Sequence, residues 1–396
     1  MTDTALPTRR RRWQLTGLLL AEVVSTLGSE MTAVALPWLV LITTGSATRT
    51  GAVLAAQFAG MALLGLWGGQ VATRLGARTM MLASDLTRAG LMASLPVLLW
   101  AHVWSFPAVL VVGLLVGAFF PGYSSAQRLV LADIVGDDEV RLTRAGGLMG
   151  SLNEASSLAG PLLGGLLVAL AGASEVLVVD AVSYLCAFLL VALLVSARGT
   201  TAGSDEHGTG VTGGLRYVAG SSVLRRQLLG VGLVEVAFTA MMATLPLLAL
   251  RNGGGAAVAG TLLAAYGGGS VVGGLLAART RRVGGRTSSW AVAGIAASTW
   301  MLIVPAPIWV RAAGIAVNGV CAGVYFPRFF AALTARTPPA LRARVMTAVT
   351  IGISAPGPIG FLGAGLLAQH TGSITPSLLL ACAAATAGAL TLIGQD

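Results

Sequence analysis

The stretch Asn153–Gly165, NEASSLAGPLLGG, places a carboxylate, a proline and three glycines inside an apolar run from Leu148 to Ala171. Its small and polar residues recur every three or four positions, on one face of a helix: Asn153, Ser157, Gly160 and Gly164. Small residues at this spacing let membrane helices pack closely. Pro161 removes a backbone donor and favours a bend at a fixed place. We therefore expect a tightly packed, hinged membrane helix.

The composition of the whole chain is that of a membrane protein. Of 396 residues, 55% are hydrophobic and 10% are charged, with mean hydropathy +0.83, whereas an ordinary soluble domain has about 25% charged residues. A span needs about 20 apolar residues to cross a hydrocarbon core of about 30 Å. We expect an all-α membrane protein with 12 transmembrane helices, at 14–43, 50–73, 80–101, 105–130, 143–171, 175–197, 226–250, 255–279, 287–304, 308–334, 341–369 and 374–393.

The net charge of +10 follows the topology of the spans. All 25 basic residues are arginines. If the N-terminus is cytoplasmic and the sides alternate, only Arg49, Arg251 and Arg311 fall on or near the outer side. This positive-inside asymmetry predicts a multi-pass membrane protein with both termini in the cytoplasm. It explains the charge without a nucleic-acid partner.

The sequence does not indicate soluble catalysis or nucleotide hydrolysis. It has no G-x-x-x-x-G-K-[ST] motif for binding phosphates. The three cysteines, Cys186, Cys321 and Cys382, lie in apolar segments without metal-binding spacing. We expect no enzymatic activity, no cofactor and no metal.

Short patterns recur in the two halves of the chain, as in many transporters. GAFFP at 117–121 and GVYFP at 323–327 lie 206 positions apart, and the Gly-Gly pairs at 68–69 and 273–274 lie 205 apart. GLL recurs at 165–167 and 365–367. We therefore expect a six-helix half at 1–197 and another at 226–396. A cytoplasmic central loop at 198–225, with a short interfacial helix, would join them.

Together these features resemble the major facilitator superfamily. LGSEMTAVALPWLVLITTGSATRTG (27–51), SDLTR (84–88) and FFPGYSSAQRLVLADIV (119–135) are most similar to the branch that contains macrolide-efflux and siderophore-export proteins. The resemblance covers nearly the whole chain. It implies the major facilitator fold, alternating access and a functional monomer in the bacterial inner membrane. It assigns the exporter motif G-P-x-x-G-G, a packing and gating hinge, to Gly160, Pro161, Gly164 and Gly165.

The loop after the second expected helix reads GQVATRLGAR at 69–78, where the family usually has G-x-x-x-D-R-x-G-x-R. Thr73 stands where the family carries Asp. The resemblance implies a cytoplasmic latch, with Asp85 of the next helix supplying the missing negative charge to an arginine. The latch residues would be Gly69, Arg74, Gly76, Arg78 and Asp85. Alternatively, the two arginines only determine topology.

Four carboxylates lie deep in the expected spans, where a lone charge is expensive: Glu22, Glu30, Glu154 and Glu235. Burial favours the neutral form of a carboxylic acid, so such a group can load a proton on one side and release it when its surroundings change. No histidine lies inside a span, so we expect any proton coupling to use these carboxylates. The alternative is permanent pairing with Arg128 or Arg328 as a structural contact.

The other charged residues of the spans lie nearer the ends. Asp85 and Arg88 fall near the cytoplasmic end of their segment, where pairing and snorkelling explain them. Asp180 lies a few residues from the outer edge, where we expect it to be solvated.

A substrate cavity with aromatic and methionine walls would suit a lipophilic or amphiphilic ligand. The spans hold fewer paired polar or basic groups than a sugar or phosphate site needs. The same side chains equally suit a lipid-facing surface. The candidates are Trp38, Phe58, Phe120, Tyr123, Arg128, Phe238, Met242, Tyr266, Tyr325 and Arg328.

We expect a secondary active transporter that exports a lipophilic or amphiphilic small molecule, such as an antibiotic, a drug or a siderophore, by proton antiport. Uptake by symport uses the same fold, but the resemblance links G-P-x-x-G-G to exporters. Lysophospholipid or lipid flipping is a second alternative. A non-transporting membrane sensor, which would bind a ligand without moving it, is a third.

Overall fold

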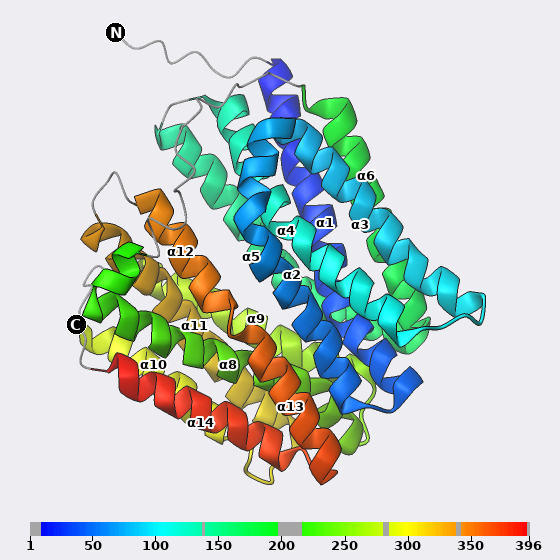
Figure 1. The fold of residues 1–396 in the computed structure, drawn as a ribbon, viewed down its shortest axis with the longest axis vertical. Coiled ribbons are helices and arrows are strands. Elements are labelled where there is room, and N and C mark those ends of the chain that lie inside the picture. Colours follow the sequence, from blue (N-terminus) through cyan, green and yellow to red (C-terminus); the bar gives the residue numbers. More distant parts are fainter. Residues whose placement is uncertain (1–8, 137–138, 197–215, 280–284, 338–341, 394–396) are drawn as a thin grey trace.

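The computed structural model describes residues 9–136, 139–196, 216–279, 285–337 and 342–393. Every regular element in these ranges is a helix (Figure 1). The helices are α1 (Arg9–Thr44), α2 (Ala47–Leu75), α3 (Ala77–Trp100), α4 (Phe106–Val135), α5 (Glu139–Leu170), α6 (Ala173–Leu194), α8 (Ser222–Arg251), α9 (Ala256–Arg279), α10 (Gly285–Trp300), α11 (Ile308–Arg336), α12 (Arg342–Ser354), α13 (Gly357–Thr371) and α14 (Thr375–Leu392).

Nine helical segments in the described ranges are long and apolar enough to cross a membrane. A helix satisfies its own backbone N–H and C=O groups, which a lipid environment requires. The predicted all-α membrane fold is therefore confirmed. Because α2, α5 and α10 are not among the nine, the count of twelve spans stays a prediction.

The eleventh expected span, 341–369, is broken, which corrects its description as one helix. Helix α12 ends at Ser354, and α13 begins at Gly357 with Pro356 as its N-cap. Proline lacks an N–H group and clashes with the preceding turn, so it starts a helix more readily than it continues one. Pro356 and Pro358 therefore divide this segment.

Two helix starts depend on local residues. Gly76 separates α2 from α3 with φ of +83°, a left-handed conformation that glycine adopts without a steric penalty. Ser221 accepts a hydrogen bond from the Leu224 backbone N–H at 3.3 Å and caps α8. Residues 216–220 are helical, and α8 begins at Ser222, four positions before the expected 226. Residues 198–215 of the expected central loop lie outside the described ranges.

Helices α1–α6 and helices α8–α14 repeat the same contacts (Figure 1). In the first set α1 contacts α5 and α6, α2 contacts α4, and α3 contacts α4 and α6. In the second set α8 contacts α13 and α14, α9 contacts α11, and α10 contacts α11 and α14. The division into functional halves at 1–197 and 226–396 stays an interpretation.

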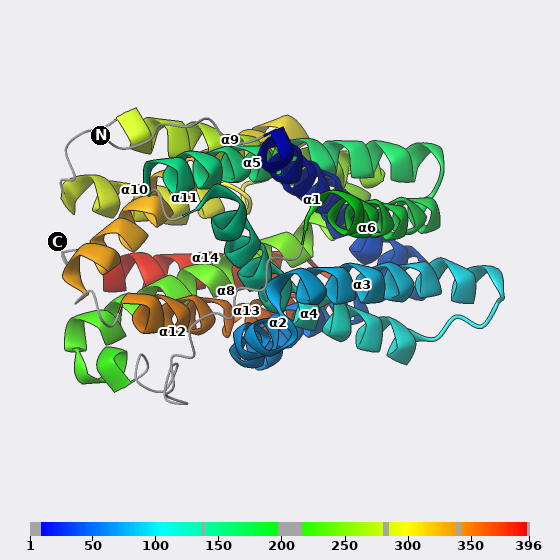
Figure 2. The same cartoon turned by 90° about the horizontal axis from the view of Figure 1, so that it is seen from above.

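Two close helix crossings join the sets, α2 with α13 and α5 with α9, and lie at opposite edges of the view in Figure 2. A Cβ atom added to Gly165 would lie 2.7 Å from the Ala256 carbonyl oxygen, and one added to Gly365 would lie 2.7 Å from that of Ala47. The two crossings thus use glycines 200 positions apart against alanines 209 positions apart. We call the region of these two crossings the closed end.

Hydrogen bonds reinforce the crossing of α2 with α13. The Thr48 hydroxyl donates to the Gly365 carbonyl at 3.2 Å, and the Ala47 backbone N–H donates to the Gln369 side chain at 3.0 Å. These bonds link the first turn of α2 to the last two turns of α13. Close backbone contact and hydrogen bonding together hold the two helix sets at this end.

Exposed tryptophans lie close to helix termini. Trp13 is near the start of α1, Trp100 ends α3, Trp300 ends α10 and Trp309 is near the start of α11. Tryptophan is enriched where a membrane meets water, since its ring is apolar and its N–H is polar. Their positions agree with a protein whose helix ends lie at the membrane surfaces.

Candidate transport site

A cavity of about 680 Å³ lies among helices α1–α6. Four of the expected substrate-cavity residues line it: Phe58, Phe120, Tyr123 and Arg128. Two of the expected carboxylates, Glu22 and Glu30, also line it. Its volume is typical of a site for a drug-sized ligand, about 300–1,000 Å³. We refer to it as the main cavity.

The main cavity adjoins a cleft of about 640 Å³ between the two helix sets. The two spaces share Met61, Phe120, Ser124 and Arg128 as wall residues. The opposite wall of the cleft includes Met346 and Ser354 of α12, which precede the break in the eleventh segment. Gly365 at the closed end follows that break, so the cleft and the closed end involve different parts of this segment.

The remaining candidates from the aromatic and basic set are distributed differently. Phe238 and Tyr266 line a second, smaller cavity. Trp38 and Tyr325 pack in the hydrophobic cores of their own helix sets and are 8% and 5% exposed. Met242 packs at the edge of a core cluster, and Arg328 is buried.

Whether the last four residues line a substrate cavity stays a prediction. None of them lines a cavity described here: Trp38, Met242, Tyr325 and Arg328. Trp38 and Tyr325 pack in the cores of their own helix sets, and a membrane helix is apolar on both its lipid-facing and its inward faces. Its sequence therefore gives little sign of which side is inward.

Glu22 and Glu30 both come from α1 and both have polar partners. The Gln127 amide of α4 donates a hydrogen bond to Glu22, which is buried. The Ser157 hydroxyl of α5 donates to Glu30 at 2.7 Å. Neither contact involves Arg128 or Arg328. The structure thus gives these two acids neutral hydrogen-bond donors.

Glu154 lies one turn before Ser157 on α5, and its side chain is exposed. Its depth in the membrane stays a prediction. Glu154 interacts electrostatically with Glu30, and also with Tyr266 of α9. Tyr266 in turn interacts with Glu235 of α8. The two helix sets meet where α1 and α5 contact α8 and α9. Three acids lie along this junction: Glu30, Glu154 and Glu235.

Asp85 and Arg88 form a pair, as the sequence predicts, and the structure buries this pair inside the first helix set. An Arg88 Nη atom lies 2.7 Å from an Asp85 carboxylate oxygen. The guanidinium carbon of Arg88 lies 4.4 Å from the ring centroids of both Tyr123 and Tyr184. This cation is held between two aromatic rings, each a favourable contact, and it also lines the main cavity.

Asp180 is fully buried, so the expectation that it is solvated is wrong. It accepts hydrogen bonds from the Thr32 hydroxyl at 2.7 Å and the Ser183 hydroxyl at 3.3 Å. Helix α6 packs against α1 and α3, which covers this position. One signal could have identified the cluster: the Asp85–Arg88 and Asp180–Ser183 pairs are each three residues apart, so each pair shares a helix face.

The expected pairing of Asp85 with Arg78 is corrected, whereas a pairing with Arg74, whose side chain lies outside the described part of the structure, stays a prediction. Asp85 pairs with Arg88, whereas Arg78 donates to the backbone carbonyls of Val195 and Ala192, both at 2.7 Å. Arg78 thus ties the start of α3 to the end of α6, where free carbonyls favour a cation.

Two further latch residues fall in α2. Gly69 and Arg74 are within this helix, but the surroundings of Gly69 and the side chain of Arg74 lie outside the described part of the structure. Their role in a latch stays a prediction.

The exporter-motif residues pack α5 closely against two helices, α1 and α9. Gly160 and Gly164 face α1, at Glu30 and Met31, and Gly165 faces α9. A Cβ atom on Gly164 would lie 2.7 Å from the Met31 carbonyl oxygen. The carbonyl of Pro161 contacts Gly260 of α9. The motif therefore provides close packing on two faces of one helix, and its role as a hinge stays a prediction.

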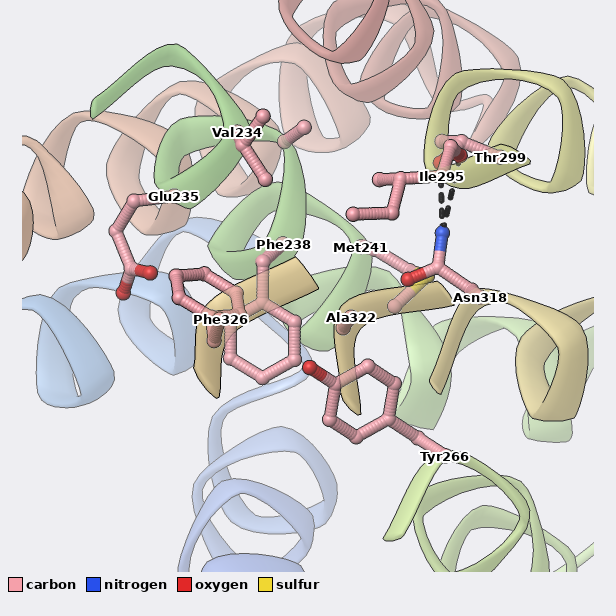
Figure 3. Close-up of a pocket in the computed structure, with 11 residues that line it drawn as sticks. Val234, Glu235, Phe238, Met241, Tyr266, Ile295, Thr299, Asn318, Ala322 and Phe326 are labelled. Atoms are coloured by element: carbon pink, nitrogen blue, oxygen red, sulfur yellow. Dashed lines mark hydrogen bonds between the residues drawn. The ribbon is translucent and has the colours of Figure 1, made fainter. Parts of the chain in front are cut away.

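In the described ranges, no three His, Cys, Asp or Glu side chains are grouped so that they could hold a metal ion. The small cavity that contains Phe238 and Tyr266 also contains Glu235 (Figure 3). The ionisable groups of the site are thus carboxylates, tyrosines and arginines, which can bind charged ligands or protons.

Comparisons with known proteins agree with this geometry. Residues 7–395 match the sequence profile described as transmembrane secretion effector. The chain is 27% identical, over 92% of its length and 89% of the relative, to the multidrug efflux pump Tap of Mycobacterium tuberculosis. Its fold is similar to the nucleoside transporter NupG (TM-score 0.78, 11% identity, 96% and 98% of the two chains). It is also similar to a bacterial homologue of the iron transporter ferroportin (TM-score 0.72, 15% identity, 96% and 98%).

Proposed function

Because this chain belongs to the transmembrane secretion effector family of the major facilitator superfamily, we propose that it exports a lipophilic or amphiphilic small molecule in exchange for protons. It would act as a monomer in the bacterial inner membrane. The observation that carries this proposal is the main cavity of about 680 Å³, which has Glu22 and Glu30 in its wall and adjoins the cleft between the helix sets.

The wall of the main cavity supports the cargo class. It combines apolar side chains such as Phe58 and Phe120 with a few charged ones, the mixture that drug-sized amphiphiles require. Tap, a relative over most of the chain, is named a multidrug efflux pump. Export of drug-like molecules is the function that fits both observations.

The carboxylates support the choice of proton as the exchanged ion. Glu22 and Glu30 bind neutral donors, Gln127 and Ser157, and each can exchange a proton with water that enters the main cavity. A carboxylate that is protonated in one conformation and ionised in another links proton movement to the conformational cycle. Glu154 and Glu235, at the junction of the helix sets, are further candidates for this role.

We propose that both termini face the cytoplasm and that the cleft opens to this side. The closed end, with Gly165 and Gly365, would then seal the outer side. Export requires this seal to open and the cleft to close, with Arg78 and Gly76 in the cytoplasmic latch and Pro161 in the hinge. The arginine distribution supports this orientation.

Transport into proteoliposomes tests the proposal. The protein is reconstituted, a proton gradient is imposed, and hydrophobic antibiotics, siderophores and lysolipids are assayed. We expect uphill movement of at least one drug against the entering protons, and loss of this movement when the gradient collapses. Glu22→Gln, Glu30→Gln, Glu154→Gln and Glu235→Gln are compared with the parent.

Glu175→Gln serves as the control, since the hydrogen bond that Glu175 forms in the described part of the chain is with Ser174 in the first turn of α6. Transport that survives both collapse of the gradient and all four substitutions would contradict proton antiport. Movement of cargo in the same direction as the protons would indicate symport, and movement of lysolipids alone would indicate a flippase.

A further inference from the structure

The second helix set encloses a small cavity of about 80 Å³ between α8, α9, α10 and α11 (Figure 3). Glu235, Phe238, Tyr266, Asn318 and Phe326 line it. We call it the small cavity. The small cavity shares no lining residue with the main cavity.

Glu235 is the acidic group of the small cavity. Its side chain is partly exposed, and its carboxylate lies beside the Phe326 ring in Figure 3. Within the described ranges, no side chain forms a hydrogen bond or ion pair with it. An ionised carboxylate in an apolar setting is costly unless an opposite charge or a donor accompanies it. The position therefore favours a ligand that brings one.

The polar side chains Asn318 and Thr299 line the small cavity on the opposite side from Glu235 (Figure 3). Asn318 donates from its amide nitrogen to the Ile295 carbonyl at 3.1 Å, to Ser298 at 3.1 Å and to Thr299 at 3.0 Å. An amide nitrogen has only two N–H groups, so both are committed to α10. Figure 3 shows the amide oxygen on the side turned away from Thr299, toward Met241. The Thr299 hydroxyl is itself committed, since it donates to the Ile295 carbonyl at 2.7 Å.

Aromatic rings form the rest of the wall. The rings of Phe238 and Tyr266 lie 4.9 Å apart between centroids, and Phe326 adds a third ring. The face of an aromatic ring attracts a cation within about 6 Å, and this contact is strongest where water is excluded. A carboxylate, an amide side chain and three aromatic rings thus line a single small volume.

We propose that the small cavity binds an organic ammonium group of the cargo, with Glu235 as counter-ion and Phe238, Tyr266 and Phe326 as an aromatic wall. A quaternary or tertiary ammonium head with its methyl groups suits a space of about 80 Å³, whereas the bulk of a drug-sized molecule needs the larger spaces outside it. The inference rests on the proposed function only in assigning the ammonium group to a transported molecule.

Choline and 3,3-dimethylbutan-1-ol provide the test. The second compound has nearly the shape of choline, but a neutral carbon replaces the charged nitrogen. Binding of each is measured by saturation-transfer NMR to the full-length protein in nanodiscs, at one pH and without a gradient. We expect the parent protein to bind choline more tightly than its carbon analogue. Glu235→Gln should weaken choline binding at least tenfold and leave binding of the carbon analogue unchanged.

Two variants refine this result. Glu235→Asp keeps the charge and should retain part of the choline affinity. Phe238→Leu keeps an apolar wall without its ring and should weaken choline more than the carbon analogue. Glu175→Gln, a carboxylate removed from another region, should change neither ligand.

The proposal is overturned if the parent binds both ligands equally or does not bind choline, or if Glu235→Gln leaves choline affinity unchanged. Unchanged binding of the carbon analogue shows that a variant is folded. Because choline carries a permanent charge and no gradient is present, choline binding does not depend on proton coupling. Failure of proton-driven transport with intact choline binding would therefore overturn the proposed function alone.

Discussion

Arg88 and Asp85 form an ion pair at 2.7 Å, with 4% and 0% of their side chains exposed. The Arg88 guanidinium also interacts electrostatically with Asp180, and Asp85 interacts with Glu22. One buried cation thus faces an acidic neighbourhood drawn from α1, α3 and α6. This cluster fixes the interior of the first helix set.

Breaking this pair from one side should destabilise the protein strongly. Arg88→Gln leaves the buried carboxylates without their cation, and Asp85→Asn leaves the cation without its bound carboxylate. Removing one partner of a buried pair costs about 3–5 kcal/mol. We expect both variants to lower the thermal unfolding midpoint in detergent, measured by tryptophan fluorescence. The double variant should recover part of the loss, and additive losses would contradict coupling between the two residues.

The two tyrosines beside Arg88 should respond differently to loss of their hydroxyls. The Tyr184 hydroxyl bonds to Ser29 at 2.8 Å, so Tyr184→Phe should cost about 1 kcal/mol. The buried Tyr123 hydroxyl has no hydrogen-bond partner in the described part of the chain, so Tyr123→Phe should leave the thermal midpoint unchanged or raise it. Tyr123→Leu, which removes the ring over Arg88, should lower it. An equal loss in the two Phe variants would refute this assignment.

Filling the glycine crossings should force the closed end apart. A Cβ atom on Gly165 or Gly365 would lie 2.7 Å from a backbone carbonyl oxygen of the opposite helix, closer than real contacts allow. Overpacking of this kind costs about 1–3 kcal/mol. We expect Gly165→Ala and Gly365→Ala each to slow transport at least tenfold in proteoliposomes.

Gly150→Ala is the matched control on α5, because a Cβ atom there meets nothing within 4 Å. It should transport at the parent rate. If Gly165→Ala also did so, tight packing at the closed end would not be required for transport.

Removing hydrogen bonds from the crossing of α2 with α13 should favour opening of the closed end without adding bulk. Thr48→Val and Gln369→Leu together remove two bonds, worth about 2 kcal/mol, which is a roughly 30-fold shift in a conformational equilibrium. Spin labels at exposed positions 49 and 370, in a chain whose three native cysteines are replaced, should report a longer distance by electron paramagnetic resonance.

Thr261→Val is the control for that experiment, since within the described residues the Thr261 hydroxyl donates to the Ala257 carbonyl of its own helix. Its distance distribution should match that of the parent. An unchanged distribution in the Thr48→Val, Gln369→Leu variant would mean that the backbone contact alone holds the closed end.

The membrane fold could be predicted from the sequence because hydropathy reports directly on the solvent around a helix. Close packing at Gly160 and Gly164 could be predicted because small residues recur at helical spacing. Which side of each helix faces the protein interior could not be predicted. Trp38 and Tyr325 pack in cores and Phe120 is 48% exposed, yet all three are large apolar residues in apolar helices. In a soluble helix an apolar stripe marks the core, but in lipid this contrast disappears.

Burial of the charged side chains cannot be predicted from the sequence for a different reason. Distance from the end of a segment does not determine burial, because neighbouring helices decide what covers each position. Asp180 lies near the start of α6 but is enclosed by contacts with α1 and α3. Arg88 is enclosed by the rings of Tyr123 on α4 and Tyr184 on α6, and no local sequence pattern predicts these contacts.

The crossing of α5 with α9 has an electrical consequence. At Gly165 the neighbouring atoms are the backbone of Ala256, Ala257 and Gly260, so helix meets helix through amides and aliphatic carbon. A proton travels along water, hydroxyl or ionisable groups, and none of these is among the three atoms nearest to a Cβ position at Gly165. In a carrier powered by a proton gradient, such a contact limits the leakage of protons through the protein, so the gradient is preserved while cargo is loaded.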